Sequence, residues 1–235
     1  MIRKLFISTM TLAATLSSSA QQRQTITLTD GWSFSRDNVS WTEVSVPHDW
    51  AIAGPFDKKW DLQFVAIEQN GEKEKTEKSG RSGALPWIGE GHYRTTVKLP
   101  KGYTRAILMI DGAMSQPTVT INGKKAGFWA YGYNAFNIDA TEYLNFDGSD
   151  NEIAVDLKNV EESSRWYPGG GLYRPVRLLL TGKCRFQPWE TFVRTVSVDA
   201  SKAVVSVSTK LLDHPKGTSV TAEILDANGN KVCDT

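Results

Sequence analysis

The fold is indicated most clearly by residues 93–123, which read YRTTVKLPKGYTRAILMIDGAMSQPTVTING. Apolar and polar residues alternate from Tyr93 to Leu99, and a Pro-Lys-Gly turn follows. Residues 106–110 form a continuous apolar run, which is typical of a strand buried on both faces. Asn122-Gly123 is a favoured dipeptide for a tight hairpin turn. The stretch therefore predicts short strands joined by turns.

The same pattern continues on both sides of this stretch. Apolar residues alternate over 26–28, 153–157 and 176–180, and only residues 140–144 suggest a single helical turn. No long amphipathic helix is evident. Many short strands between turn signals predict an all-β fold, an antiparallel jelly-roll β-sandwich.

The composition is that of a folded, aromatic-rich protein. The chain has 235 residues, of which 40% are apolar and 23% charged, and its formal net charge is +1. These values argue against disorder, collagen-like repeats and a disulfide-stapled miniprotein. They also give no basic surface for nucleic acid. Eight Trp, seven Tyr and nine Phe could serve both a core and stacking on sugar rings.

The first twenty residues have the three parts of a secretory signal peptide. Arg3 and Lys4 precede an apolar run that is too short to span a bilayer, and Ser18-Ser19-Ala20 is a small-residue cleavage site. No Cys follows the run, so no lipid anchor is expected. Loss of the two basic residues would change the formal charge from +1 to −1. We expect an exported protein, periplasmic or secreted, that does not associate with a membrane.

The chain after the leader divides into two β regions. Valines alternate with polar residues over 193–207, and another hairpin turn stands at 228–229. About four strands are expected after residue 187, whereas an immunoglobulin-like sandwich has about seven. We therefore predict a signal peptide at 1–20, a jelly-roll sugar-binding domain at 21–183 and the N-terminal, incomplete part of an immunoglobulin-like β-sandwich at 184–235.

Two other features of the chain are less decisive. Residues 68–81 carry four Glu and four Lys or Arg, and this balanced charge predicts a solvated loop. Cys184 and Cys233 would remain after export to an oxidising compartment, and the sequence leaves open whether they pair.

Sequence signatures of catalysis and metal binding are missing. His48, His92 and His214 are scattered, and no phosphate-binding loop or nucleophile elbow is present. We expect no metal and no cofactor.

Two segments nevertheless carry side chains suited to a sugar: VPHDW at 46–50 and SSRWYPGGGLYR at 163–174. Aromatic faces can pack on a pyranose ring while Arg and Asp bind its hydroxyl groups with charge assistance. The same residues have structural alternatives. Trp50 and Trp166 could cap the edge of the sandwich, and Asp49 could cap a turn.

Six motifs occur in a characteristic order along the chain. They are VPHDW (46–50), YRT (93–95), DGA (111–113), VTING (119–123), NEIAV (151–155) and SRWYPGGGLYR (164–174). Together they resemble the N-terminal sugar-binding domain of glycoside hydrolase family 2, in its exported bacterial β-galactosidase-like branch. The resemblance covers about residues 24–182 and extends more weakly into the tail. The family usually has Trp before the Tyr-Arg pair, where this chain has His92.

The resemblance implies an enzyme whose chemistry lies outside this chain. Family members combine a jelly roll, an immunoglobulin-like sandwich and a catalytic (β/α)₈ barrel. They hydrolyse terminal β-galactosides, β-glucuronides or β-mannosides with retention, using two barrel glutamates. These would lie beyond residue 235, and we read the single Asn-Glu dipeptide here, Asn151-Glu152, as structural. The chain by itself is therefore expected to have no catalytic residue and no glycosidase activity.

The resemblance also implies a binding site and partners. The positions that match the family's sugar-facing loops are Asp49, Arg165, Trp166 and Tyr167. Some family members have an acidic residue near the position of Arg165. The implied partners are a carbohydrate substrate, a β-galactoside or related glycoside, and the protein's own C-terminal barrel. The oligomeric state is not decided, so a homo-oligomer stays open.

Three functions compete on the sequence. The chain could be part of a β-galactosidase-type glycoside hydrolase, a free-standing carbohydrate-binding module, or a secreted β-sandwich interaction protein. The incomplete second sandwich favours the first, and the reading frame after Thr235 would discriminate among them.

Overall fold

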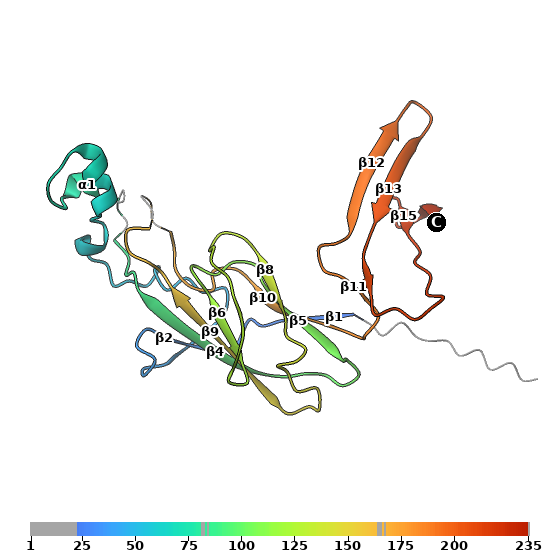
Figure 1. Ribbon diagram of the computed structural model, residues 1–235, viewed down its shortest axis with the longest axis horizontal. Coiled ribbons are helices and arrows are strands. Elements are labelled where there is room, and N and C mark those ends of the chain that lie inside the picture. Colours follow the sequence, from blue (N-terminus) through green and yellow to red (C-terminus); the bar gives the residue numbers. More distant parts are fainter. Residues whose placement is uncertain (1–22, 81–82, 84, 164–165, 167, 235) are drawn as a thin grey trace, which may run out of the picture.

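The computed structural model describes residues 23–80, 83, 85–163, 166 and 168–234. Within these ranges the chain is built almost entirely from antiparallel strand pairs (Figure 1), which confirms the predicted all-β fold class. The predicted signal peptide lies outside the described residues. No helix in the described part of the chain has the length and apolar character needed to cross a bilayer.

Two antiparallel sheets form the sandwich, with strand orders β3-β2-β4-β9-β6-β7 and β1-β10-β5-β8. The six-stranded sheet contains β2 (Trp32–Ser35), β3 (Thr42–Val44), β4 (Glu90–Lys98), β6 (Thr118–Ile121), β7 (Lys124–Phe128) and β9 (Asp150–Lys158). The four-stranded sheet contains β1 (Gln24–Thr27), β5 (Arg105–Ile110), β8 (Phe136–Asp139) and β10 (Val176–Thr181). Strands distant in sequence are neighbours in both sheets, so the loops between them meet at the ends of the sandwich.

The core lies between the two sheets. Alternate residues of β4 and β9 are buried, and the side chains of Trp32, Leu108 and Ile153 are fully enclosed. On β5 the consecutive residues Ile107 and Leu108 point to opposite faces, and they are only 7% and 0% exposed. The prediction that 106–110 is buried on both faces is therefore confirmed for its central residues.

The predicted hairpin turn at Asn122-Gly123 joins β6 to β7. Both residues have positive φ, 49° and 75°, as the favoured two-residue hairpin turn requires. The Asn122 side-chain amide also donates to the Tyr143 carbonyl at 2.8 Å and to Asn151 Oδ1 at 2.9 Å. Asn122 therefore adopts the backbone conformation that the turn requires and also connects the turn to β9.

The segment between β3 and β4 differs from the prediction. It contains two short 3₁₀ helices, η1 (Lys58–Trp60) and η2 (Glu77–Ser79), and one helix, α1 (Phe64–Asn70). Helix α1 ends at Gly71, which has a left-handed φ of 70°. The expected solvated loop at 68–81 is therefore partly structured. Seven residues span only about two turns, too few to show a helical period in the sequence.

The α1 segment is fastened to the loop that follows β9. Glu162 forms an ion pair with Lys75 and accepts a hydrogen bond from the Phe64 backbone N–H at 3.2 Å. The Lys75 ammonium also lies 4.1 Å from the centre of the Phe64 ring. Charged side chains of this segment thus interact with other residues of the protein, and not only with solvent.

Residues beyond 183 form three separate antiparallel pairs. These are β11 (Arg185–Phe186) with β14 (Leu211–Leu212), β12 (Phe192–Val198) with β13 (Ala203–Ser208), and β15 (Glu223–Leu225) with β16 (Lys231–Asp234). Five strands thus begin after residue 187, where four were expected. Of the residues beyond 182 whose side chains are described, none is buried.

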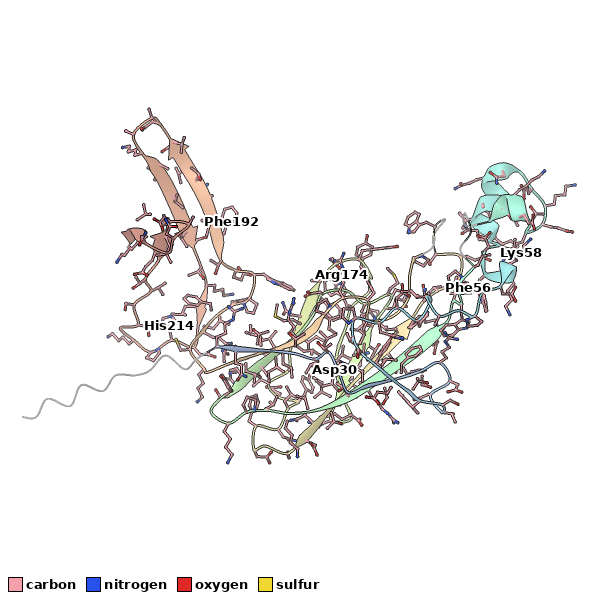
Figure 2. The ribbon with its side chains drawn as sticks, turned by 180° about the vertical axis from the view of Figure 1, so that it is seen from behind. Asp30, Phe56, Lys58, Arg174, Phe192 and His214 are labelled. Carbon is pink, nitrogen blue, oxygen red and sulfur yellow. The ribbon has the colours of Figure 1, made fainter. Side chains whose placement is uncertain are left out.

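The second region contacts the sandwich at its start, where Arg105 lies 3.8 Å from Asp213, and extends away from it beyond that point. Figure 1 shows β12 and β13 projecting away from it. Figure 2 places Phe192 and His214 at the opposite end of the molecule from Phe56 and Lys58. Cys184 is a free, exposed cysteine. The immunoglobulin-like assignment of 184–235 stays a prediction.

Candidate functional site

The two segments singled out in the sequence lie side by side. The His48 backbone N–H donates to the Leu172 carbonyl at 2.8 Å, and the Trp50 N–H donates to the Gly170 carbonyl at 3.0 Å. The alternating pattern of these bonds pairs the VPHDW segment with the glycine-rich turn in an antiparallel sense. Two loops that are more than a hundred residues apart in sequence therefore form one surface.

Asp49 joins the two loops through its side chain. Its Oδ1 accepts hydrogen bonds from the backbone N–H groups of Ala51 at 2.9 Å and Gly170 at 3.2 Å. The first bond closes a local turn, whereas the second spans 121 residues of sequence. The structure therefore gives Asp49 a structural role. The predicted contact between Asp49 and a sugar stays a prediction.

Glycine is required where the loops approach most closely. A Cβ on Gly170 would lie 2.3 Å from the Trp50 ring, and a Cβ on Gly171 would lie 2.4 Å from the His48 carbonyl oxygen. Gly171 also has a φ of 114°, which side chains disfavour. The three consecutive glycines thus allow close packing against VPHDW.

Trp50 belongs to the core and not to the surface. It is 1% exposed, and its ring stacks on Phe34 at a centroid distance of 5.6 Å. The Trp87 ring contacts it edge-on, also with the centroids 5.6 Å apart. The burial of Trp50 confirms the structural alternative for this residue. It also anchors the loop that carries His48 and Asp49.

His48 and Tyr93 form a polar contact beneath the loops. His48 Nδ1 lies 2.6 Å from the Tyr93 hydroxyl group. Burial lowers the pKa of His48 from its ordinary value, and the nearby Arg36 charge lowers it further, whereas Asp49 opposes both. Burial likewise raises the pKa of the Tyr93 hydroxyl well above its usual range. Both groups are therefore uncharged at neutral pH.

A cavity of about 390 Å³ opens beside His48, and it is lined both by residues of the VPHDW segment and by residues that the sequence did not single out. Phe34 and Trp50 supply apolar walls, and Arg36 and Asp37 supply charged groups. The Arg36 guanidinium donates to the Gly54 and Trp50 carbonyls, which holds it in place. Arg36 can be assigned to the site only from the fold, because a single Arg in a turn forms no recognisable sequence motif.

Of the other predicted site residues, only Trp166 falls within the described part of the chain. Arg165 and Tyr167 lie outside it. Trp166 is 57% exposed, and its Nε1 donates to the Tyr133 hydroxyl group at 2.8 Å. Sequence reasoning missed Tyr133, although the cluster of aromatics in FWAYGYNAF at 128–136 was a usable signal.

A larger cavity, of about 760 Å³, lies between the four-stranded sheet and the start of the second region. Met109 and Leu179 line it from the sheet, and Phe186 and Trp189 line it from the following segment. It contains none of the predicted site residues. Among the described residues, no group of three or more His, Cys, Asp or Glu is arranged to hold a metal ion.

Two further sequence expectations can be placed in the sandwich. Asn151 is fully buried, and its Oδ1 accepts hydrogen bonds from the Asn145 backbone and the Asn122 side chain, which is a structural role, whereas Glu152 is exposed. His92, which replaces the Trp usual in the family, lies opposite Asp156 on β9, with His92 Nδ1 2.6 Å from a carboxylate oxygen. A polar cross-strand contact thus stands where an aromatic ring was expected.

The fold is that of the β-sandwich at the N-terminal end of glycoside hydrolase family 2 enzymes, as comparison with known proteins shows. No protein-family model matches the chain. A β-galactosidase of Bacteroides ovatus is 37% identical over 201 residues, which is 83% of this chain and 22% of the relative. In sequence, the chain corresponds to the N-terminal part of glycoside hydrolase family 2 enzymes. It spans about a fifth of the length of the curated relatives that it matches.

Solved structures give the same result. A glycoside hydrolase family 2 member from Bacteroides cellulosilyticus has a TM-score of 0.73 and 28% identity, covering 90% of this chain and 28% of that one. A β-glycosidase of Bacteroides vulgatus has a TM-score of 0.71 and 26% identity, covering 90% and 27%. A β-glucuronidase of Bacteroides uniformis has a TM-score of 0.64 and 25% identity, covering 91% and 25%.

Proposed function

We propose that this chain is the sugar-binding N-terminal region of an exported glycoside hydrolase of the β-galactosidase type, and that it acts together with a catalytic (β/α)₈ barrel. The observation that carries the proposal is the match of more than four fifths of the chain to the N-terminal part of such enzymes. The leader at 1–20 supports a periplasmic or extracellular location.

In this function the joined loops present binding groups to the terminal sugar. Asp49 would fix sugar hydroxyls from the VPHDW segment, where its carboxylate also holds the Gly170 loop. The guanidinium of Arg165 would bind further hydroxyls, and Trp166 and Tyr167 would form an aromatic wall. The chain would thus orient the glycoside while the barrel supplies the acid/base and the nucleophile.

The proposal is tested by comparing the 235-residue chain with the product of the complete reading frame that contains it. The complete product is expected to hydrolyse nitrophenyl β-galactoside, and the 235-residue chain should show no turnover above a buffer blank. Parallel assays with nitrophenyl β-glucuronide and β-mannoside establish the sugar preference.

Two results would overturn the proposal. The first is a complete product that hydrolyses none of the three glycosides. If it still bound methyl β-galactoside, the chain would instead be a free-standing carbohydrate-binding module. The second is turnover by the 235-residue chain alone, which would place catalytic groups within it.

A further inference from the structure

Three aromatic rings lie exposed and next to one another on the sandwich. Tyr131 and Tyr133 belong to the loop between β7 and β8, and Trp166 belongs to the loop between β9 and β10. They are 59%, 40% and 57% exposed. The ring centres of Tyr131 and Tyr133 are 5.5 Å apart, and Trp166 donates a hydrogen bond to the Tyr133 hydroxyl group. We call these three residues the aromatic platform.

Contacts with neighbouring residues fix the loop that carries Tyr131 and Tyr133. The Tyr173 hydroxyl group donates to the Gly132 carbonyl at 2.8 Å. Trp129 donates to Asn134 Oδ1 at 2.8 Å, and its ring stacks on Phe136 at 5.6 Å with the planes nearly parallel. The backbone on both sides of Tyr131 and Tyr133 is therefore fixed while their rings face solvent. Exposed rings on a fixed support mark an interaction surface.

The chemistry of the platform fits a sugar. All three of its exposed side chains are aromatic. Tyr and Trp combine an apolar face with a polar edge, which matches the C–H face and hydroxyl rim of a pyranose. Arg174 is exposed with its guanidinium 5.4 Å from the centre of the Tyr173 ring, and because Tyr173 bonds to Gly132 it adds a charged donor near this loop.

We propose that the aromatic platform extends the terminal-sugar site, of which Trp166 forms one wall, so that Tyr131 and Tyr133 bind further pyranose units of an oligosaccharide chain. The inference rests on the proposed carbohydrate function and extends it to polymeric substrates. The ring faces stack on successive units, and the phenolic groups of Tyr131 and Tyr133 bind their hydroxyls. The formal net charge of +1 gives no field that would favour a polyanion.

The test measures binding of two probes to the 235-residue chain by isothermal titration or NMR. The probes are β-1,4-linked galactotetraose and methyl β-galactoside. We expect the tetraose to bind at least tenfold more tightly than the monosaccharide. Tyr131→Ala should weaken tetraose binding five- to tenfold and leave the monosaccharide affinity unchanged, whereas Tyr131→Phe should retain binding, because the ring face is kept.

Phe192→Ala is the matched control, because Phe192 is also exposed but lies on β12, at the far end of the molecule (Figure 2). It should bind both probes as the unmodified chain does. The inference is overturned if both probes bind equally, if neither binds, or if Tyr131→Ala binds tetraose normally; the last result would assign the platform to contact with the catalytic barrel instead. Hydrolysis of nitrophenyl β-galactoside by the complete product stays a separate measurement, so the two proposals can fail independently.

Discussion

Single residues in this protein perform structural tasks that the sequence specified only in part. Asp49 was predicted as a ligand of sugar hydroxyls or, alternatively, as a turn cap, and the structure shows its Oδ1 bonded to the N–H of its own turn and to that of Gly170 in the other loop. Gly170 is one of three consecutive glycines, and a methyl group in place of its hydrogen atom would overlap Trp50. At this scale the candidate site depends on very close packing of backbone against side chains.

Asp49→Ala should lower the thermal stability of the chain. Removal of the carboxylate leaves the Ala51 and Gly170 N–H groups without this acceptor, at a cost of about 1–3 kcal/mol. For a protein of this size that corresponds to a fall in melting temperature of roughly 3–10 °C. Asp49→Asn keeps an oxygen in place and should lose less than half as much. Thermal unfolding followed by circular dichroism measures both.

Asp147→Ala serves as the comparison, because Asp147 also accepts a backbone N–H in a turn, from Ser149 at 2.9 Å, but is exposed on the loop before β9. It should change the melting temperature by less than Asp49→Ala does. An Asp49→Ala chain that keeps its melting temperature and binds galactoside more weakly would show that Asp49 serves the ligand and not the fold.

At the scale of elements, the α1 segment and the loop after β9 act as a pair. Neither belongs to one of the two sheets of the sandwich, yet Glu162 connects them through Lys75 and the Phe64 N–H. The Lys75 and Glu162 side chains are 29% and 24% exposed, so their interaction is only partly screened by water. The connection matters for the site because Glu162 precedes the predicted sugar-facing residues by three to five positions.

Glu162→Ala should loosen α1 without unfolding the sandwich. We expect hydrogen exchange of the amides in residues 64–70 to become about tenfold faster, which is equivalent to about 1.4 kcal/mol of local stability. Hydrogen exchange with mass spectrometry on a peptide covering α1 gives the rate. The neighbouring substitution Glu161→Ala is the control, and equal exchange rates in the two variants would show that Glu162 does not hold the helix.

At the scale of the whole molecule, the sandwich contains the buried core and the second region contains small, exposed sheets. Every residue of the hydrophobic core cluster lies between 28 and 180. Two-stranded sheets without a buried face are marginally stable in water. The cooperative unfolding of this chain should therefore report on the sandwich, in which His48 is half-buried.

The stability of the sandwich should fall as the pH is lowered from about 7.5 to about 5.5. In the unfolded chain His48 takes up a proton near pH 6.5, whereas burial lowers its pKa in the folded chain. Between the two pKa values the unfolded state binds more protons, so the free energy of unfolding falls with decreasing pH. His48→Gln should reduce this dependence, while also lowering stability at pH 7.5 by about 1–3 kcal/mol through loss of the Tyr93 contact.

Melting temperatures at the two pH values provide the measurement. His214→Gln is the control, because His214 is exposed in the second region and should leave the pH dependence unchanged. A His48→Gln chain with the full pH dependence of the unmodified protein would assign that dependence to other groups.

The strands and hairpin turns could be predicted because their signals are local. Alternation over residues 93–99 and 153–157 reflects one buried and one exposed face of β4 and β9, and Asn122-Gly123 specifies its own turn. The strand β2 and the helix α1 were missed because each has only about one or two periods in which to show a pattern. The resemblance to glycosidases likewise depended on short, contiguous motifs.

The sequence by itself therefore determined the all-β class and the main turns, and it singled out the two segments that we propose bind sugar. Only the tertiary structure decided that Asp49 meets Gly170, that Trp166 meets Tyr133 and that Glu162 meets Phe64. These pairs are between about thirty and more than a hundred residues apart, and their contact depends on the order and register of strands in two sheets. Periodicity and turn chemistry act over a few residues, whereas strand order is set by which faces can be buried together, and that is a property of the assembled core.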